Sequence, residues 1–353
     1  ISNNRIYSIV EDSQGNLWFG TFNGVNIWDR FKPRFNLYTA RHNDPESLNS
    51  SFVWSFIEYR PHIIWMGTDL GISVFNANTR KVSQLSTYFT SENKLSSDRV
   101  RSLLKDSHGN VWIGTRDAGL NKLETKTGKI YTFRPSIQYR NSICDEYILN
   151  IYEDRNGLIW VGTNGGLNTI DPLTHEIRVY KYDPENKNSI SSNVVYDFME
   201  DHDGYLWIAT LDGLNKFHPE TGTFSSYKNI WHNENKITTD RLFCLFEDTD
   251  NNFWIGTRGG GLELFDRETK TFKSYTMQDG LPNNVVYGVL EDGNGNLWMS
   301  TNWGISMFDK ANESFVNFDV TDGLQSNEFN AGAYLRSSTG EMFFGGMKGF
   351  NVF

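Results

Sequence analysis

The chain has 353 residues, and its 33 Lys plus Arg against 43 Asp plus Glu give a formal net charge of −10. This acidic balance argues against general binding to nucleic-acid phosphates or to anionic membrane surfaces. The two cysteines, Cys144 and Cys244, stand in no CxxC arrangement and beside no patterned His, so the sequence predicts no metal site, no cofactor and no redox motif.

Short strands are predicted along the whole chain. Aromatic residues make up 15% and glycines number 31, whereas prolines number only 8, which is typical of short strands joined by tight glycine turns. No long apolar run and no charged-then-apolar leader occurs, so any contact with a membrane is expected to come from segments outside this sequence. Because the sequence begins inside its repeat pattern, we interpret it as a piece of a longer protein.

One unit recurs in chain order at intervals of about 47 residues. Its marker is an aromatic residue, in seven copies a tryptophan and in the last copy a phenylalanine: Trp18, Trp65, Trp112, Trp160, Trp207, Trp254, Trp298 and Phe343. The predicted repeats lie near residues 2–49, 50–96, 97–144, 145–191, 192–238, 239–282, 283–325 and 326–353. A fixed period of this size predicts a repeat architecture spanning residues 1–353.

Each unit contains four apolar runs. In the fifth copy, the first run ends in the acidic pair Glu200-Asp201, and the second surrounds the marker Trp207. The third and fourth runs are residues 213–217 and 224–227. Four strands joined by turn residues make one blade of a β-propeller, so the predicted fold class is all-β, a single β-propeller of four-stranded blades. The marker indoles are expected to pack between adjacent blades.

The number of blades is open, because the fourth run occurs only seven times. The last one is residues 315–318, and nothing after Phe353 could supply an eighth. One closure has eight blades, the last with three strands. The other is a seven-bladed ring whose leftover first blade belongs to a preceding propeller. We slightly favour the eight-bladed ring.

The Glu-Asp-x-x-Gly stretch that follows the first run is interpreted as a hairpin turn. Asp can close such a turn through its side chain, and Gly accepts the positive φ that the turn needs. A calcium loop is the alternative, since Asp248-Thr249-Asp250 and Asp201-His202-Asp203 space carboxylates as metal loops do. The bidentate Glu that such a loop needs downstream is missing, which favours the turn.

The repeat at residues 153–168, Glu-Asp-Arg-Asn-Gly-Leu-Ile-Trp-Val-Gly-Thr-Asn-Gly-Gly-Leu-Asn, closely resembles the two-component-regulator propeller repeat, and the resemblance extends over all eight copies. It implies the periplasmic sensor region of a hybrid two-component histidine kinase of Bacteroidetes that detects glycan breakdown products. A homodimer of the full-length protein fits this implication. Related repeats also occur in secretion-system propellers and in a propeller lyase, so a protein-docking scaffold for secretion or adhesion is the alternative and a lyase a more distant one.

Candidate ligand-binding residues lie on one predicted face, called the top. It carries the Gly-Thr-x-x-Gly turns and the connections from each fourth strand to the next first strand, and its residues vary from copy to copy. An oligosaccharide or a protein could be held there by planar polar groups and aromatic rings. The candidates are Trp54, Asp69, Arg99, Arg101, Arg116, Asp117, Tyr147, Asp212, Arg241, Arg258, Asn302 and Trp303.

No catalytic constellation is predicted. The seven histidines fall at unrelated repeat positions, with no nucleophile elbow and no metal-ligand spacing near them. We therefore expect this chain to be a recognition domain and not an enzyme, without nucleic-acid partners.

Overall fold

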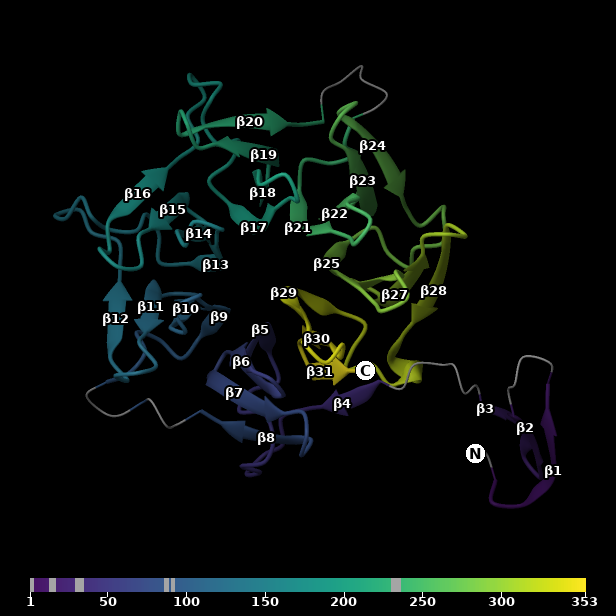
Figure 1. The fold of residues 1–353 in the computed structure, drawn as a ribbon. Coiled ribbons are helices and arrows are strands. Elements are labelled where there is room, and N and C mark those ends of the chain that lie inside the picture. The colour runs from purple at the N-terminus through teal and green to yellow at the C-terminus, as the bar shows by residue number, and fades with distance from the viewer. Residues whose placement is uncertain (1–2, 13–16, 29–34, 86–88, 90–92, 230–235) are drawn as a thin grey trace. The chain divides into compact units, whose positions relative to one another are not determined.

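The computed structural model describes residues 3–12, 17–28, 35–85, 89, 93–229 and 236–353. The chain divides into two compact units, Ile1–Phe35 with Phe353, and Asn36–Val352. Within the larger unit, four-stranded antiparallel sheets surround a common centre as the blades of a propeller (Figure 1). The all-β propeller predicted from the repeats is confirmed.

Six blades of the larger unit take their strands in chain order from the centre outward. Blade 1 is β5 (Val53–Arg60), β6 (Ile63–Thr68), β7 (Gly71–Asn76) and β8 (Lys81–Gln84). Blade 2 is β9 (Val100–Lys105), β10 (Val111–Thr115), β11 (Leu120–Leu123) and β12 (Ile130–Phe133). Blade 3 is β13 (Ile148–Glu153), β14 (Ile159–Thr163), β15 (Leu167–Ile170) and β16 (Ile177–Tyr180).

The next three blades repeat this order. Blade 4 is β17 (Val195–Glu200), β18 (Leu206–Thr210), β19 (Gly213–His218) and β20 (Thr223–Tyr227). Blade 5 is β21 (Leu242–Glu247), β22 (Phe253–Thr257), β23 (Leu262–Asp266) and β24 (Thr271–Tyr275). Blade 6 is β25 (Val286–Glu291), β26 (Leu297–Thr301), β27 (Gly304–Asp309) and β28 (Ser314–Phe318), followed by the short 3-10 helix η1 (Val320–Asp322).

Blade 7 closes the ring with strands from both ends of the unit. Its inner strands are β29 (Phe329–Arg336), β30 (Met342–Gly346) and β31 (Gly349–Val352), and its outer strand is β4 (Asn36–Tyr38), which pairs antiparallel with β31. Each inner strand contacts the next one around the ring, and β29 contacts β5. The ring therefore closes with seven blades.

This closure corrects the preference for eight blades in the ring and agrees with the seven-bladed ring of the other alternative. The fourth run of the first repeat, expected to complete its own blade, instead pairs with the open edge of the last repeat, because an unpaired edge leaves backbone N–H and C=O groups unsatisfied. The remaining strands of the first repeat, β1 (Ile6–Glu11), β2 (Leu17–Thr21) and β3 (Gly24–Trp28), form a three-stranded sheet in the smaller unit.

The marker aromatics of the seven blades form the core between neighbouring sheets. Six tryptophans are at most 5% exposed and Phe343 is fully buried, whereas Trp18 of the smaller unit is 39% exposed. Trp207 of blade 4, for example, packs against Leu242 and Phe253 of blade 5. The packing predicted between blades is confirmed for the larger unit.

The two residues of the acidic pair make different contacts. The aspartate closes its own turn: Asp106 accepts a hydrogen bond from the Asn110 backbone N–H at 2.7 Å and one from the Trp112 indole at 2.9 Å. Gly109 of this turn has a φ of +85°, so the predicted turn is confirmed. The glutamate reaches the preceding blade instead, as Glu153 shows by accepting from the Ser107 backbone N–H at 2.7 Å.

This contact between blades recurs around the ring. The backbone N–H of the residue after the turn aspartate, or of its counterpart in blade 7, donates to the glutamate of the next blade at 2.7–2.9 Å, in the pairs Arg155–Glu200, His202–Glu247, Thr249–Glu291 and Ser338–Glu58. Blade 2 has Lys105 in place of the glutamate, and its ammonium donates to the Tyr59 carbonyl of blade 1 at 2.7 Å. Among the described residues, no helix is long and apolar enough to cross a membrane.

Candidate functional site

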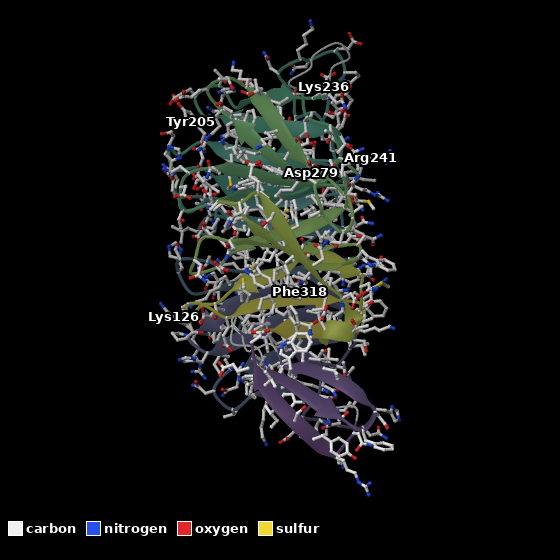
Figure 2. The ribbon with its side chains drawn as sticks, turned by 90° about the vertical axis from the view of Figure 1, so that its right-hand side faces the viewer. Lys126, Tyr205, Lys236, Arg241, Asp279 and Phe318 are labelled. Carbon is white, nitrogen blue, oxygen red and sulfur yellow. The ribbon has the colours of Figure 1, made fainter. Side chains whose placement is uncertain are left out.

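The two faces of the propeller carry different kinds of connection. Tyr205, in the turn from β17 to β18, and Lys126, in the turn from β11 to β12, lie at one edge of the side view (Figure 2). Lys236 and Arg241, in the connection from β20 to β21, lie at the opposite edge, so we call the face of Tyr205 and Lys126 the bottom. The division of the turns into two faces follows from the alternating direction of the strands within each blade.

Five of the twelve predicted residues come together where blades 1, 2 and 3 adjoin. We call Trp54, Asp69, Arg101, Arg116 and Tyr147 the rim cluster. The Trp54 indole donates to Asp69 Oδ1 at 2.9 Å, and Arg116 Nη1 donates to the same oxygen at 3.3 Å. Arg116 Nε donates to the Tyr147 hydroxyl at 3.2 Å, and its guanidinium lies 4.7 Å from the centre of the Trp54 ring.

The strand order explains why these residues meet. Asp69 follows β6 in blade 1, Arg116 follows β10 in blade 2, and Tyr147 directly precedes β13 in blade 3. Equivalent turns of successive blades are neighbours around the ring, so side chains from three repeats converge. Trp54, Asp69, Arg116 and Tyr147 are all partly exposed, so an indole, a cation, a carboxylate and a hydroxyl lie together at this edge.

Arg101 lies deeper than the other members of the cluster. Its residue is only 6% exposed, its Nη1 donates to the Trp54 carbonyl at 3.3 Å, and its guanidinium lies 5.2 Å from the Trp54 ring. Burial, which disfavours the charged form, lowers the pKa of Arg101. Arg101 thus supports Trp54 from below.

The other seven candidates lie apart from the rim cluster or at its margin. Arg99 and Asp117 form an exposed ion pair at 3.3 Å. Asp212 and Arg241 line an open groove of about 620 Å³ between blades 4 and 5, where Lys228 pairs with Asp212 at 2.5 Å. The remaining three are Arg258, whose backbone N–H donates to the Arg241 carbonyl, Asn302, which accepts from the Tyr287 hydroxyl, and Trp303, which is 57% exposed.

The sequence did not predict a second polar group, which lies on the inner strands. Asp197 of β17 accepts hydrogen bonds from Asn150 Nδ2 at 2.7 Å, from the Leu245 backbone N–H at 2.9 Å and from the Tyr334 hydroxyl at 3.3 Å. Burial raises the pKa of Asp197 to about 7, against the effect of these hydrogen bonds. The sequence feature that could have indicated this group is an acidic residue in the middle of the apolar run Val-Tyr-Asp-Phe-Met at residues 195–199.

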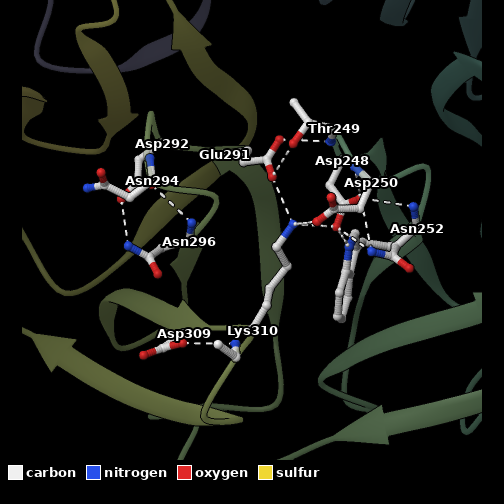
Figure 3. A network of polar contacts seen from close by, with 12 residues as sticks. Asp248, Thr249, Asp250, Asn252, Glu291, Asp292, Asn294, Asn296, Asp309 and Lys310 are labelled. Carbon is white, nitrogen blue, oxygen red and sulfur yellow. Dashed lines mark hydrogen bonds and ion pairs between the residues drawn. The ribbon is translucent and has the colours of Figure 1, made fainter.

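A third polar network lies between the bottom turns of blades 5 and 6 (Figure 3). The Lys310 ammonium lies 2.8 Å from Asp248 Oδ2, 2.9 Å from Asp250 Oδ2 and 2.8 Å from Glu291 Oε1. Burial opposes its charge, but the three hydrogen bonds outweigh burial and raise the pKa of Lys310. The three carboxylates lie close enough to share a metal ion, and here an ammonium lies among them.

Two protein-family models match parts of this chain. The model of the SMP-30/Gluconolactonase/LRE-like region matches residues 34–228, which is more than half of the chain. The model of the two component regulator propeller matches residues 1–23, 236–259 and 280–303. The search of curated proteins finds no match.

Three solved structures illustrate the structural likeness. The extracellular domain of a putative hybrid two component system from B. thetaiotaomicron is 28% identical with a TM-score of 0.76, over 100% of this chain and 45% of that one. Virginiamycin B lyase from Staphylococcus aureus is 16% identical with a TM-score of 0.64, over 90% and 98%. PorZ of the type-IX secretion system of Porphyromonas gingivalis is 14% identical with a TM-score of 0.56, over 99% and 56%.

The last two likenesses, at 16% and 14% identity, concern the fold alone. The first combines fold with a closer sequence, although this chain spans less than half of that relative's length. The chain resembles the extracellular domain of a hybrid two-component system in both respects. It contains repeats that match the two component regulator propeller, and through residues 34–228 it belongs to the family of the SMP-30/Gluconolactonase/LRE-like region.

Proposed function

We propose that this propeller is the periplasmic ligand-sensing domain of a hybrid two-component histidine kinase and that it binds an oligosaccharide released from a complex glycan. The observation that carries the proposal is the rim cluster, where a partly exposed indole lies beside a guanidinium, a carboxylate and a phenol. The likeness to an extracellular sensor region supports the location and the signalling role.

The chemistry of the cluster suits a sugar ring. A pyranose presents C–H groups on its faces, which pack on an aromatic ring, and hydroxyls at its edge, which need planar donors and acceptors. Trp54 offers the ring, Arg116 offers donors, and Asp69 offers an acceptor. Because Asp69 and Tyr147 already bind Arg116, its guanidinium is held in place before a ligand arrives.

The test is isothermal titration calorimetry against a panel of oligosaccharides obtained by enzymatic digestion of several polysaccharides. A binding sugar should lose at least about tenfold in affinity in the Trp54→Ala variant and in the Arg116→Ala variant. Arg178→Ala is the matched control, because Arg178 is 72% exposed on the outer strand β16 and pairs only loosely with Glu176. Equal losses in all three variants, or in none, would refute the role of the rim cluster.

A protein-docking scaffold is the second candidate, and two exposed apolar side chains in the predicted top turns favour it. Leu70 is 63% exposed and Trp303 is 57% exposed. Exposed apolar groups of this size are common anchors of protein interfaces. A panel without a single sugar ligand, together with a purified protein partner whose binding is lost in Trp303→Ala, would favour this candidate.

We also propose that the chain is not an enzyme. The sensor likeness supports this proposal, while the gluconolactonase-like family match and the lyase likeness define the activities to assay. Purified protein should open neither a gluconolactone nor a cyclic streptogramin above the uncatalysed rate. Turnover that is lost in Asp197→Asn would contradict the proposal, because Asp197 is the buried carboxyl whose pKa of about 7 would suit a general base.

A further inference from the structure

We propose that a cavity among the inner strands of the propeller, lined by Arg101 of the rim cluster, binds a small monocarboxylate anion through this arginine. The cavity has a volume of about 170 Å³ and is lined by residues of β5, β9, β13 and β29, which are inner strands of blades 1, 2, 3 and 7. This inference does not depend on sugar recognition by the exposed part of the rim.

The first observation is a buried cation without a carboxylate partner. Arg101 is 6% exposed, and among the described residues no Asp or Glu oxygen lies within 4.0 Å of its guanidinium nitrogens. Two other candidate arginines differ, since Arg99 pairs with Asp117 and Arg116 pairs with Asp69. The partners of the Arg101 guanidinium are uncharged, namely the Trp54 carbonyl, the Trp54 ring and the Tyr147 side chain. A buried charge is costly unless it is paired with an opposite charge, so an anion in the cavity that Arg101 lines would be favoured.

The second observation is a buried hydroxyl without a hydrogen bond. Ser55 lines the same cavity, is 6% exposed, and its Oγ has no partner. Buried polar groups are almost always satisfied, so an unpaired hydroxyl in the cavity that Arg101 also lines favours an acceptor there. We propose that an oxyanion in the cavity accepts from both side chains.

The cavity wall leaves the guanidinium accessible. Gly332 of β29 has a φ of +80°, and a Cβ at this position would lie 3.3 Å from Arg101 Nη1. A glycine therefore provides the space in which an anion could approach the forked N–H groups. The volume corresponds to about five or six waters, which admits acetate or lactate but no sugar chain.

An acidic residue next to the cavity wall favours a monoanion over a dianion. Asn150 and Tyr334 both line the cavity and both donate to Asp197. Where Asp197 is ionised, above its pKa of about 7, it repels an anion in the cavity, and it repels a dianion more strongly than a monoanion. A planar carboxylate also matches the guanidinium fork better than a halide does. Acetate should therefore bind more tightly than sulfate or chloride.

The experiment measures binding of sodium acetate and sodium lactate to the whole chain by calorimetry and by thermal unfolding, at constant ionic strength balanced with sodium fluoride. At a hundredfold excess over its Kd, acetate should raise Tm by at least about 3 °C, and sulfate and chloride should raise it less. Arg101→Met should weaken binding at least about tenfold, and Ser55→Ala several-fold. Arg99→Met, which removes an exposed and paired arginine, should change nothing.

Two results would overturn the proposal. If the parent protein shows no acetate-dependent heat and no Tm rise, waters alone solvate Arg101. If acetate binds equally well to the parent, to Ser55→Ala and to Arg101→Met, the anion binds elsewhere. Should Arg101→Met fail to fold, the parent titration and the Ser55→Ala variant still decide the question.

Discussion

Asp197 shows how one residue departs from the repeat. The corresponding positions in blades 1, 3 and 5 are Ser55, Asn150 and Cys244, which are all uncharged. Only blade 4 places a carboxyl there, and Tyr334 reaches it from blade 7. The ring of Tyr334 also fills the space that a side chain at Gly288 would need.

The raised pKa of Asp197 predicts a pH dependence. A carboxyl that titrates near 7 when folded and near 4 when unfolded keeps its proton only in the folded state between these values. The free energy of unfolding should therefore fall as pH rises from about 4 to 7, by an amount on the order of a few kcal/mol. Urea unfolding of the parent and of Asp197→Asn, at several pH values, measures it.

In Asp197→Asn, most of this fall in the free energy of unfolding between about pH 4 and pH 7 should disappear. The raised pKa of His202, caused by its hydrogen bond to Glu247, adds stability that is likewise lost as pH rises, but it acts in both proteins and cancels in the comparison. Identical slopes in the two proteins would show that Asp197 titrates normally.

At the scale of elements, the blade-to-blade glutamates predict a measurable contribution to stability. Glu153→Ala removes acceptors for the Ser107 backbone N–H and hydroxyl, at 2.7 and 2.6 Å. It should cost about 1.5 to 3 kcal/mol in urea unfolding, because hydrogen bonds to a charged group are lost and their donors are left behind. Glu176→Ala, whose side chain is 67% exposed, should cost no more than about 0.5 kcal/mol. Equal losses of stability in the two variants would show that the glutamate contact between blades does not stabilise the fold.

The Lys310 network predicts a larger effect. In Lys310→Met, Asp248 and Glu291 remain buried, with side chains 0% and 3% exposed, but lose their cation. Breaking a buried ion pair in this way should cost about 3 to 5 kcal/mol. The exposed pair Lys273–Glu313 is the control, and Lys273→Met should cost less than about 1 kcal/mol. A small loss in Lys310→Met would mean that water solvates the carboxylates.

The strands, the turns and the packing of the marker aromatics could be predicted because the same pattern recurs in every repeat. Asp106 and Gly109 lie three residues apart in one turn, and Trp112 lies at the same position of its strand as the marker residue of every other repeat. The glutamate contacts could not be predicted, since they join residues about 45 positions apart in two blades. The burial of Arg101 depends on how the blades close into a ring, and the contact of Tyr334 with Asp197 depends on an irregular register in β29. Neither feature has a pattern in the sequence.

For the whole molecule, closure of the ring by β4 predicts that the two ends of the larger unit depend on each other. Residues 29–353 contain all seven blades and should unfold within about 2 °C of the parent. Residues 41–353 lack β4, leave β31 as an open edge, and should unfold several degrees lower and aggregate more readily. Thermal unfolding and light scattering measure both. Equal stability of the two fragments would show that β4 does not hold the ring closed.

The central claim is that the rim cluster recognises the ligand, and hydrogen–deuterium exchange tests it most directly. With a bound oligosaccharide from the titration panel, amides of residues 68–71, 115–119 and 145–148 should be protected, because these turns carry Asp69, Arg116 and Tyr147. The bottom turns at residues 154–158 and 201–205 should exchange as in the free protein. Protection confined to those bottom turns would contradict the account.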